Sequence, residues 1–129
     1  MKKISILILE DNPETLSVIF KILSQLESEA VFYPIVLSTY LQVEELINKS
    51  SQQFDIILLD RDCALGGSFH ILDINKFGID KVIGISSVPP YNEELQKKGV
   101  KRIINKDFRN LKSFEDALFE TLLESVIKS

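Results

Sequence analysis

Short apolar runs alternate with longer amphipathic stretches along the whole chain. Such runs are typical of buried parallel strands, because both faces of those strands are covered. They predict five strands, at residues 4–9, 35–37, 54–59, 81–85 and 102–104. In the other stretches, apolar residues recur at helical spacing, which predicts five helices, at about 12–26, 39–47, 68–76, 92–98 and 113–127.

The alternation of strands with helices limits the fold. Short connections between parallel strands require right-handed crossovers, which place helices on both faces of a sheet. Five such units predict an α/β fold of the flavodoxin-like (βα)5 type, a doubly wound parallel five-stranded sheet with strand order 2-1-3-4-5. No linker or internal repeat divides the chain, so we expect a single domain over residues 1–129.

Individual residues predict where helices begin, end and face the core. Asn12 and Pro13 predict an N-cap followed by proline at the first helical position, and Asn92 is expected to cap the fourth helix. Thr39 with Gln42 resembles a capping box. Glycines should end the third and fourth helices, at Gly78 and Gly99. The spacing predicts core-facing stripes on the first and last helices that include Leu16, Ile19, Phe20, Leu23, Leu26, Leu118, Leu122 and Ile127.

Composition narrows the functional classes. The chain is 45% hydrophobic and 26% charged, which is typical of a packed globular domain. Its net charge of −4 gives no general attraction to nucleic acid or to an anionic membrane, and no stretch approaches the ~20 apolar residues that span a bilayer. The single cysteine, Cys63, excludes an internal disulfide, and the single histidine, His70, is expected to be structural. We therefore expect a cytoplasmic protein without a membrane or nucleic-acid partner.

Polar residues capable of phosphoryl and metal chemistry follow four of the predicted strands. Glu10 and Asp11 follow the first strand, Asp60 the third, Ser86 the fourth and Lys106 the fifth. The carboxyl ends of parallel strands meet at one edge of the sheet, and ligands bind there at the switch point between the first and third strands. We therefore expect these side chains to share one pocket.

Three carboxylates in one pocket require a counterion. Two unit charges ~4 Å apart interact by about 4 kcal/mol at an effective dielectric constant near 20. All the donors are oxygens, and Mg²⁺ prefers octahedral oxygen coordination, commonly with one or two carboxylates and a phosphate. The set predicts a Mg²⁺ site equipped for phosphoryl transfer, with Asp60 as the acceptor.

Each of these residues also has a purely structural interpretation. The Glu10-Asp11 pair suits a strand exit before a helix N-terminus, where negative charge is favoured. Asp60 alone fits a turn, Ser86 fits a loop hydroxyl, and Lys106 fits an ordinary solvated lysine. The functional interpretation depends on the ordered combination at successive strand ends.

That ordered combination resembles the receiver domains of two-component response regulators, and the resemblance covers essentially all 129 residues. It implies that Glu10 and Asp11 hold Mg²⁺ directly or through water. It further implies that Asp60 accepts a phosphoryl group from a kinase phosphohistidine and contributes to the metal site. The backbone carbonyl of Asp62 would complete the metal shell.

The resemblance also implies a switch and its partners. Ser86 and Lys106 would bind the phosphoryl oxygens and shift a two-state equilibrium. The implied partners are a histidine kinase or phosphotransfer protein and a downstream protein target. We expect a stand-alone receiver that is not an enzyme, although it promotes its own phosphorylation and dephosphorylation.

Charge patterning adds one candidate surface. Basic residues cluster at Lys97, Lys98, Lys101 and Arg102, and acidic residues recur on the last helix at Glu115, Asp116, Glu120 and Glu124. Adjacent strips of opposite charge suit a protein partner or a second copy of the chain. A homodimer would use the face built by the fourth helix, fifth strand and fifth helix.

The sequence departs from the receiver pattern in several places. Asp107 replaces the usual cis proline after the lysine, so a trans peptide is expected there. Ile103 replaces an aromatic residue associated with read-out. Cys63 and Ala64 replace a frequent Met-Pro pair, and Gly67 comes one residue earlier than the usual loop glycine. The segment between the serine and the lysine is shorter by about two residues, which predicts a reduced fourth helix.

Two other functions are consistent with parts of the sequence. The segment from Leu58 to Asp62 is similar to the DxD motif of haloacid-dehalogenase-type phosphatases, in which Asp60 would attack a substrate and Asp62 would act as general acid and base. Chain order argues against this, because that family places the motif on its first strand. The other alternative is a pseudo-receiver that binds partners without phosphorylation.

Overall fold

The computed structural model describes residues 1–62 and 66–128, and its sheet has the predicted architecture. Five strands pair in parallel in the order β2-β1-β3-β4-β5. Their bounds are β1 Lys2–Leu9, β2 Ala30–Leu37, β3 Ile56–Leu59, β4 Val82–Ser86 and β5 Arg102–Asn105. The flavodoxin-like fold predicted from the sequence is confirmed.

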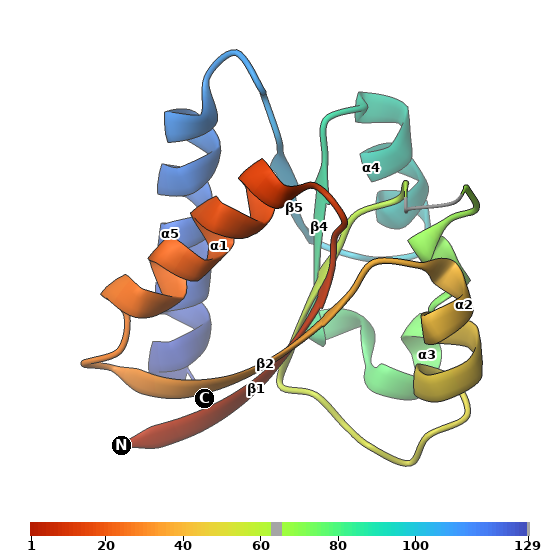
Figure 1. The fold of residues 1–129 in the computed structure, drawn as a ribbon, viewed down its shortest axis with the longest axis horizontal. Helices are drawn as coiled ribbons and strands as arrows, with labels where there is room; N and C mark the ends of the chain where they lie inside the picture. The colour runs from red at the N-terminus through yellow and green to blue at the C-terminus, as the bar shows by residue number, and fades with distance from the viewer. Residues whose placement is uncertain (63–65, 129) are drawn as a thin grey trace.

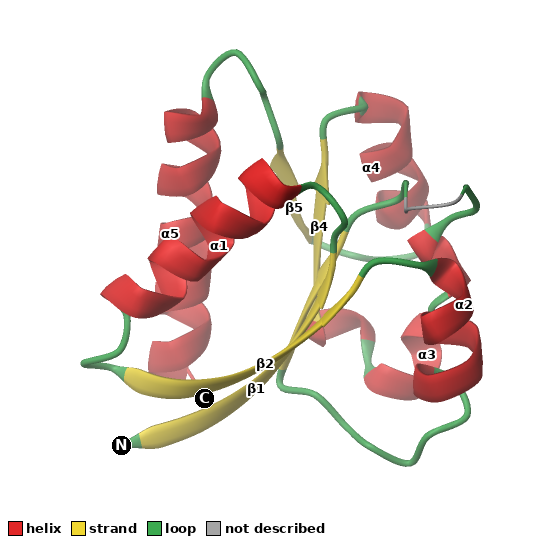
Figure 2. Ribbon diagram, viewed as in Figure 1, coloured by secondary structure: helices red, strands yellow, loops and turns green. Residues whose placement is uncertain are grey.

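Helices cover both faces of this sheet (Figure 1). On one face lie α1 (Pro13–Gln25) and α5 (Leu111–Lys128); on the other lie α2 (Tyr40–Gln42), α3 (Ile74–Phe77) and α4 (Pro89–Lys97). Three further short helical segments are η1 (Val43–Ile47, π-helical), η2 (Phe69–Ile71) and η3 (Ile79–Lys81), the last two 3₁₀-helical. Figure 2 shows the strands as a layer between the two groups of helices.

Alternation along β1 divides the apolar interior into two cores. Ile4, Ile6 and Ile8 belong to the core beneath α1 and α5, whereas Leu7 and Leu9 belong to the core on the opposite face. All five side chains are almost fully buried. A strand covered on both faces has no regular polar alternation, which is why a nearly continuous apolar run located it in the sequence.

The edge strand β2 is longer than the predicted segment 35–37. It pairs with β1 along its whole length, from Ala30 beside Lys2 to Leu37 beside Leu9. Its first half was missed because Tyr33 is exposed and Pro34 interrupts the apolar pattern. Proline is tolerated here because an edge strand has one side without a hydrogen-bonded neighbour.

The predicted helix at 68–76 is wrong as one continuous element. The structure has η2 and α3 instead, with Leu72 in an extended conformation between them (φ −53°, ψ 131°). Each piece begins with its own cap: the Ser68 hydroxyl accepts from the His70 N–H, and the Asp73 carboxylate accepts from the Lys76 N–H. Short polar side chains that bond to nearby backbone groups compete with a continuous helix.

Two other helices differ in detail from their predictions. The capping box of Thr39 and Gln42 is present, but the helix that it opens continues as π-helix, with the Asn48 N–H donating to the Val43 carbonyl. The fourth helix begins at Pro89, so Asn92 is a buried residue within α4 and not its cap. Gly99 follows the end of α4 at φ +101°, a backbone conformation that favours glycine.

The predicted core stripes are partly wrong. Phe20 is 41% exposed, and Ile22 is buried in its place. On α5, Ile127 is 65% exposed, whereas Val126 is buried beside Leu122. In both cases a neighbour one or two positions away faces the sheet, because apolar residues at adjacent helical positions leave the phase of the helix ambiguous.

Gly84 in β4 allows α4 to pack closely on the sheet. A Cβ atom at this position would lie 2.7 Å from a Leu95 methyl group and 2.8 Å from an Ile103 methyl group. Within the described residues, no helix is both long enough and apolar enough to cross a membrane.

Candidate functional site

Strand register brings the candidate residues to one edge of the sheet. Leu9 of β1 pairs with Leu59 of β3, so Glu10 and Asp60 leave neighbouring strands at the same level. The Asp60 N–H donates to the Leu9 carbonyl across 3.1 Å, which extends this alignment by one residue. The same holds on the other side, where the Lys106 N–H donates to the Ser86 carbonyl across 3.0 Å.

Lys106 lies between two of the candidate carboxylates. Its Nζ atom is 2.6 Å from Glu10 Oε1 and 3.3 Å from Asp60 Oδ2. All three residues are buried, and Glu10 is fully so. The described residues contain no cis peptide bond, so the expected trans bond between Lys106 and Asp107 is confirmed. The lysine reaches the site without the cis peptide of the family pattern.

The start of α1 holds the Glu10 carboxylate in place. Glu10 Oε2 accepts hydrogen bonds from the N–H groups of Asp11 and Asn12, at 3.0 and 3.1 Å. Asn12 is the predicted N-cap of α1, and its side chain accepts from the Thr15 N–H. The same turn therefore opens α1 and fixes the position of the Glu10 carboxylate.

Oxygen atoms of Glu10, Asp11 and Asp60 form a candidate metal site. One carboxylate oxygen from each lies within 4.8 Å of the others. Opposite ligands of an octahedral ion with bonds of about 2.1 Å are separated by roughly 4 Å, so the spacing is close to that of a Mg²⁺ shell. Carboxylate oxygens and the absence of soft donors from this group also fit Mg²⁺.

Asp60 has an unusual protonation equilibrium. Burial raises the pKa of its carboxyl group from 3.8 to about 7, and the negative charge of Glu10 contributes in the same direction. The Lys106 charge opposes this shift and lowers the pKa of Asp60. A second cation in the site would favour the ionised carboxylate further.

Ser86 is the last residue of β4 and is buried, but its hydroxyl group bonds to the backbone after the strand. Its hydroxyl accepts a hydrogen bond from the Val88 N–H across 3.1 Å, at the start of α4. Its carbonyl accepts from the Asn92 side chain across 3.3 Å, and Asn92 Oδ1 is buried without a hydrogen-bond partner in the described part of the chain. The structure therefore brings Lys106, and not Ser86, into hydrogen-bond contact with Asp60 among the described residues.

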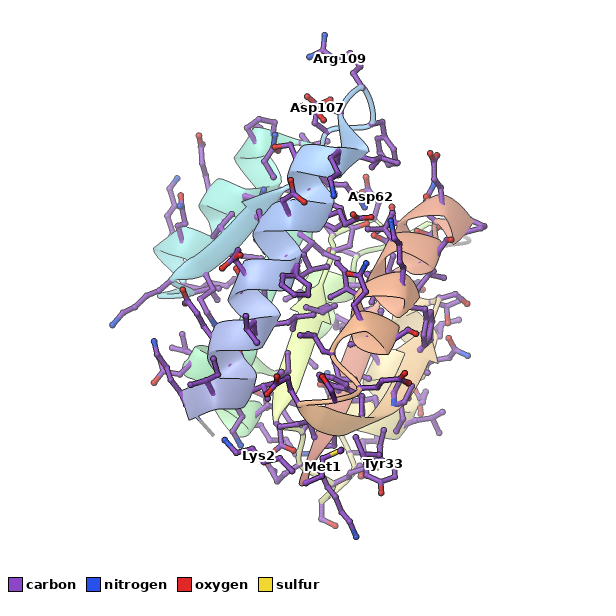
Figure 3. The ribbon with its side chains drawn as sticks, turned by 90° about the vertical axis from the view of Figure 1, so that its left-hand side faces the viewer. Met1, Lys2, Tyr33, Asp62, Asp107 and Arg109 are labelled. Carbon is purple, nitrogen blue, oxygen red and sulfur yellow. The ribbon has the colours of Figure 1, made fainter. Side chains whose placement is uncertain are left out.

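Asp62 lies at this end of the molecule, as do Asp107 and Arg109 (Figure 3). Its carboxylate is largely exposed and forms an ion pair with Arg61 at 3.2 Å. Its backbone forms an isolated antiparallel bridge with Ser68. The departures predicted at Cys63 and Ala64 lie outside the described residues.

Arg61 has contacts that its position in the sequence does not predict. Its guanidinium carbon lies 4.1 Å from the centre of the Tyr91 ring, and its Nε atom lies 3.7 Å from Glu94 Oε2. His70 contacts the same Glu94 oxygen. The residue directly after Asp60 is thus joined to α4. A basic residue beside Asp60 was the sequence signal, but its partners are distant in the chain.

A parallel sheet of this order, with an acidic cluster at its carboxyl edge, has the architecture of receiver domains. The chain is similar to the receiver domain of the response regulator PhyR from Erythrobacter litoralis (TM-score 0.69, 19% identity, 98% of this chain and 92% of that one).

It is also similar to the receiver domain of a sensor histidine kinase from Pseudomonas aeruginosa, which has a magnesium ion coordinated in its active-site cleft (TM-score 0.64, 18% identity, 96% and 98% coverage). A response regulator receiver domain from Rhodospirillum rubrum is similar to a comparable degree (TM-score 0.66, 17% identity, 95% and 94% coverage). Neither a protein-family model nor a curated protein matches the sequence. The structural likenesses establish the receiver fold.

Proposed function

We propose that residues 1–129 form a receiver domain that accepts a phosphoryl group on Asp60 in a Mg²⁺-dependent reaction and acts as a phosphorylation-controlled switch. The observation that supports this most strongly is the buried contact of Lys106 with both Glu10 and Asp60. Phosphoryl transfer needs an acceptor and cations beside it, and this contact supplies one such cation beside Asp60.

In this function Mg²⁺ would be held by Glu10, Asp11 and Asp60 and by the backbone carbonyl of Asp62. The spacing of the three carboxylates supports their part of this assignment. The ion would supply positive charge that offsets the negative charge of the incoming phosphoryl group. That charge would also keep Asp60 ionised, against the raised pKa that burial gives it.

The chemical step would be an in-line displacement. A carboxylate oxygen of Asp60 attacks the phosphorus of a phosphohistidine on a kinase or phosphotransfer protein. A P–O bond forms while the P–N bond breaks, and the donor imidazole leaves with the bonding electron pair. Lys106, already 3.3 Å from Asp60, is positioned to pair with the phosphoryl oxygens. The product is an acyl phosphate, whose hydrolysis by water would restore Asp60.

Switching would require the Ser86 hydroxyl to leave the Val88 N–H and bind a phosphoryl oxygen. Because Val88 is the N-cap of α4, that exchange would alter the start of the helix. The face formed by α4, β5 and α5 would then present the change to a downstream protein or to a second copy of the chain. We propose that the protein acts in the cytoplasm, where its phosphodonor would be available.

The test is incubation with Mg²⁺ and a small acyl phosphate, followed by intact-mass measurement. The wild type should gain one phosphoryl group, and Asp60→Asn should gain none. Asp116→Asn removes an exposed carboxylate of α5 and should behave like the wild type. Omission of Mg²⁺ should abolish the reaction. Modification of Asp60→Asn at the wild-type rate would refute the assignment.

The two alternatives make different predictions in the same experiment. A phosphatase of the DxD type requires the Asp62 carboxylate to act beside Asp60, but that carboxylate is exposed and pairs with Arg61. A pseudo-receiver would bind partners and show no mass increase.

A further inference from the structure

A group of contacts beside the candidate site links it to α4. The Arg61 guanidinium lies over the ring of Tyr91 at 4.1 Å and approaches Glu94 Oε2 at 3.7 Å, one helical turn further along α4. The Arg61 side chain is 31% exposed. The side chain directly after the proposed phosphoacceptor is therefore packed on a helix.

Glu94 is shared between Arg61 and a second residue. His70 Nδ1, on η2, lies 3.2 Å from the same Oε2 atom of Glu94. The His70 side chain is only 8% exposed. Burial lowers the pKa of His70, the hydrogen bond with Glu94 opposes this, and the charges of Lys98 and Arg61 lower the pKa further. Arg61 in its position against Glu94 is thus one of the charges that lower the pKa of His70.

The backbone of Arg61 is tied to the phosphoacceptor itself. Its N–H lowers the pKa of the Asp60 carboxyl group. Its carbonyl accepts from the Phe69 N–H across 2.8 Å, which joins it to η2 and so to the residue before His70. A chemical change at Asp60 therefore acts on a residue whose backbone contacts η2 and whose side chain contacts α4.

The contact between Arg61 and Glu94 is one that a stronger anion can displace. Glu94 is about half exposed, and ion pairs of this kind and length are weak. A phosphoryl group has a charge of about −1.5 to −2 and three strong acceptor oxygens. The planar guanidinium of arginine binds such groups through paired hydrogen bonds.

We propose that Arg61 carries the state of Asp60 to α4, because a phosphoryl group on Asp60 competes with Glu94 for the Arg61 guanidinium. When Arg61 moves away, Glu94 keeps its contact with His70, and the ring of Tyr91 on α4 is no longer covered by the guanidinium. This inference rests on the proposed function of Asp60. In this proposal Arg61 transmits the change to α4. The aromatic residue associated with read-out in receiver domains is replaced here by Ile103.

The lone histidine allows a direct test by NMR. The His70 imidazole is titrated in the full chain with Mg²⁺, with and without beryllofluoride as the phosphoryl mimic, and fluorine NMR reports whether the mimic binds. In the wild type, beryllofluoride should raise the pKa of His70. Arg61→Met should raise it without the mimic, because a facing cation is lost, and the mimic should then add no further rise.

Matched variants separate this link from a general effect of charge or stability. Arg109→Met removes an arginine whose side chain is 93% exposed, and it should leave the His70 response unchanged. Tyr91→Phe keeps the ring and should keep the response. Glu94→Gln should lower the pKa of His70 and abolish the response. It should also tighten beryllofluoride binding by about fivefold, since Glu94 no longer competes for Arg61, which keeps only its ion pair with the exposed Asp62 carboxylate.

The possible failures are distinguishable. If beryllofluoride binds to the wild type but the His70 signal does not respond, or responds equally in Arg61→Met, the link is overturned and the phosphoacceptor assignment stands. If beryllofluoride does not bind to the wild type although it is folded, the proposed function fails, and the link fails with it.

Discussion

The Lys106 ammonium lies closer to Glu10 than to Asp60, at 2.6 Å against 3.3 Å. Glu10 is fully buried, so Lys106 is the cation that neutralises it in the interior. The proposed phosphoryl-binding lysine therefore also has a structural role before any phosphoryl group is present. The folding stability of the chain should therefore depend on Lys106 and on any metal ion bound beside it.

Replacement of Lys106 by methionine should destabilise the metal-free protein by about 3–5 kcal/mol, because it leaves the buried Glu10 carboxylate without a cation. Urea denaturation measures the change. Mg²⁺ should restore part of the lost stability, since the ion can replace the missing positive charge. Lys112→Met, which removes a largely exposed lysine and its surface ion pairs, should cost no more than about 1 kcal/mol. An equal loss in both variants would contradict the buried role of Lys106.

Asp60 should make the metal-free protein less stable as pH rises. Its pKa is about 7 in the folded chain and near 3.8 when unfolded, so between these values the folded state keeps a proton that the unfolded state releases. The free energy of unfolding should therefore fall from about pH 4 to pH 7, by at most about 4 kcal/mol at ~1.4 kcal/mol per pKa unit.

Asp60→Asn removes this titration and should flatten that part of the stability curve. Above pH 7 the variant should be more stable than the metal-free wild type. The comparison requires only urea denaturation of both proteins at a series of pH values in the presence of a chelator. A wild-type free energy of unfolding that rises from pH 4 to pH 7 would contradict the prediction, because it would indicate that Asp60 is ionised in the folded chain.

Magnesium binding should depend on pH for the same reason. Protons compete with the metal for Asp60 below its pKa of about 7, so affinity should increase from pH 6 to pH 8. Isothermal titration calorimetry in two buffers of different ionisation enthalpy measures both the affinity and the protons released. Proton release should be substantial at pH 6 and small at pH 8.

The loop after β3 allows a matched test of local packing. Gly66 and Gly67 both have positive φ, at 85° and 81°. A Cβ atom on Gly67 would lie 2.3 Å from the Tyr40 ring, whereas one on Gly66 would meet nothing within 4 Å. Gly66→Ala should cost about 1 kcal/mol from backbone strain alone, and Gly67→Ala about 2–3 kcal/mol, because the ring must also move. Thermal or urea unfolding of the pair isolates the contact with Tyr40.

The fold could be predicted because the strands of a doubly wound sheet are covered on both faces. β3 and the second half of β1, from Ile6 to Leu9, are unbroken apolar runs, and the polar residues that follow them, Glu10 and Asp60, mark where they end. The strand order then places those residues side by side, so their proximity followed from topology. The roles of these residues in phosphoryl transfer remain predictions.

Other features were beyond a reading of the sequence because they depend on pairings of distant residues or on competing local bonds. Asp73 lies inside the predicted third helix, but its carboxylate accepts from the Lys76 N–H and caps α3 as a separate helix. Asn92 looked like a cap, yet it is buried against Ser86. The position of Arg61 on Tyr91 depends on how the loop after β3 approaches α4, and no spacing rule gives that approach.

Pro34 has a consequence for the solubility of the molecule. β2 forms one border of the sheet and has eight residues, several of them apolar and exposed. An exposed edge strand of that length can pair with strands of other chains and start a fibril. The ring of Pro34 removes one backbone donor midway along the strand, so an incoming chain would meet a gap in the hydrogen-bond ladder. Replacement of Pro34 should therefore favour self-association through the edge strand β2.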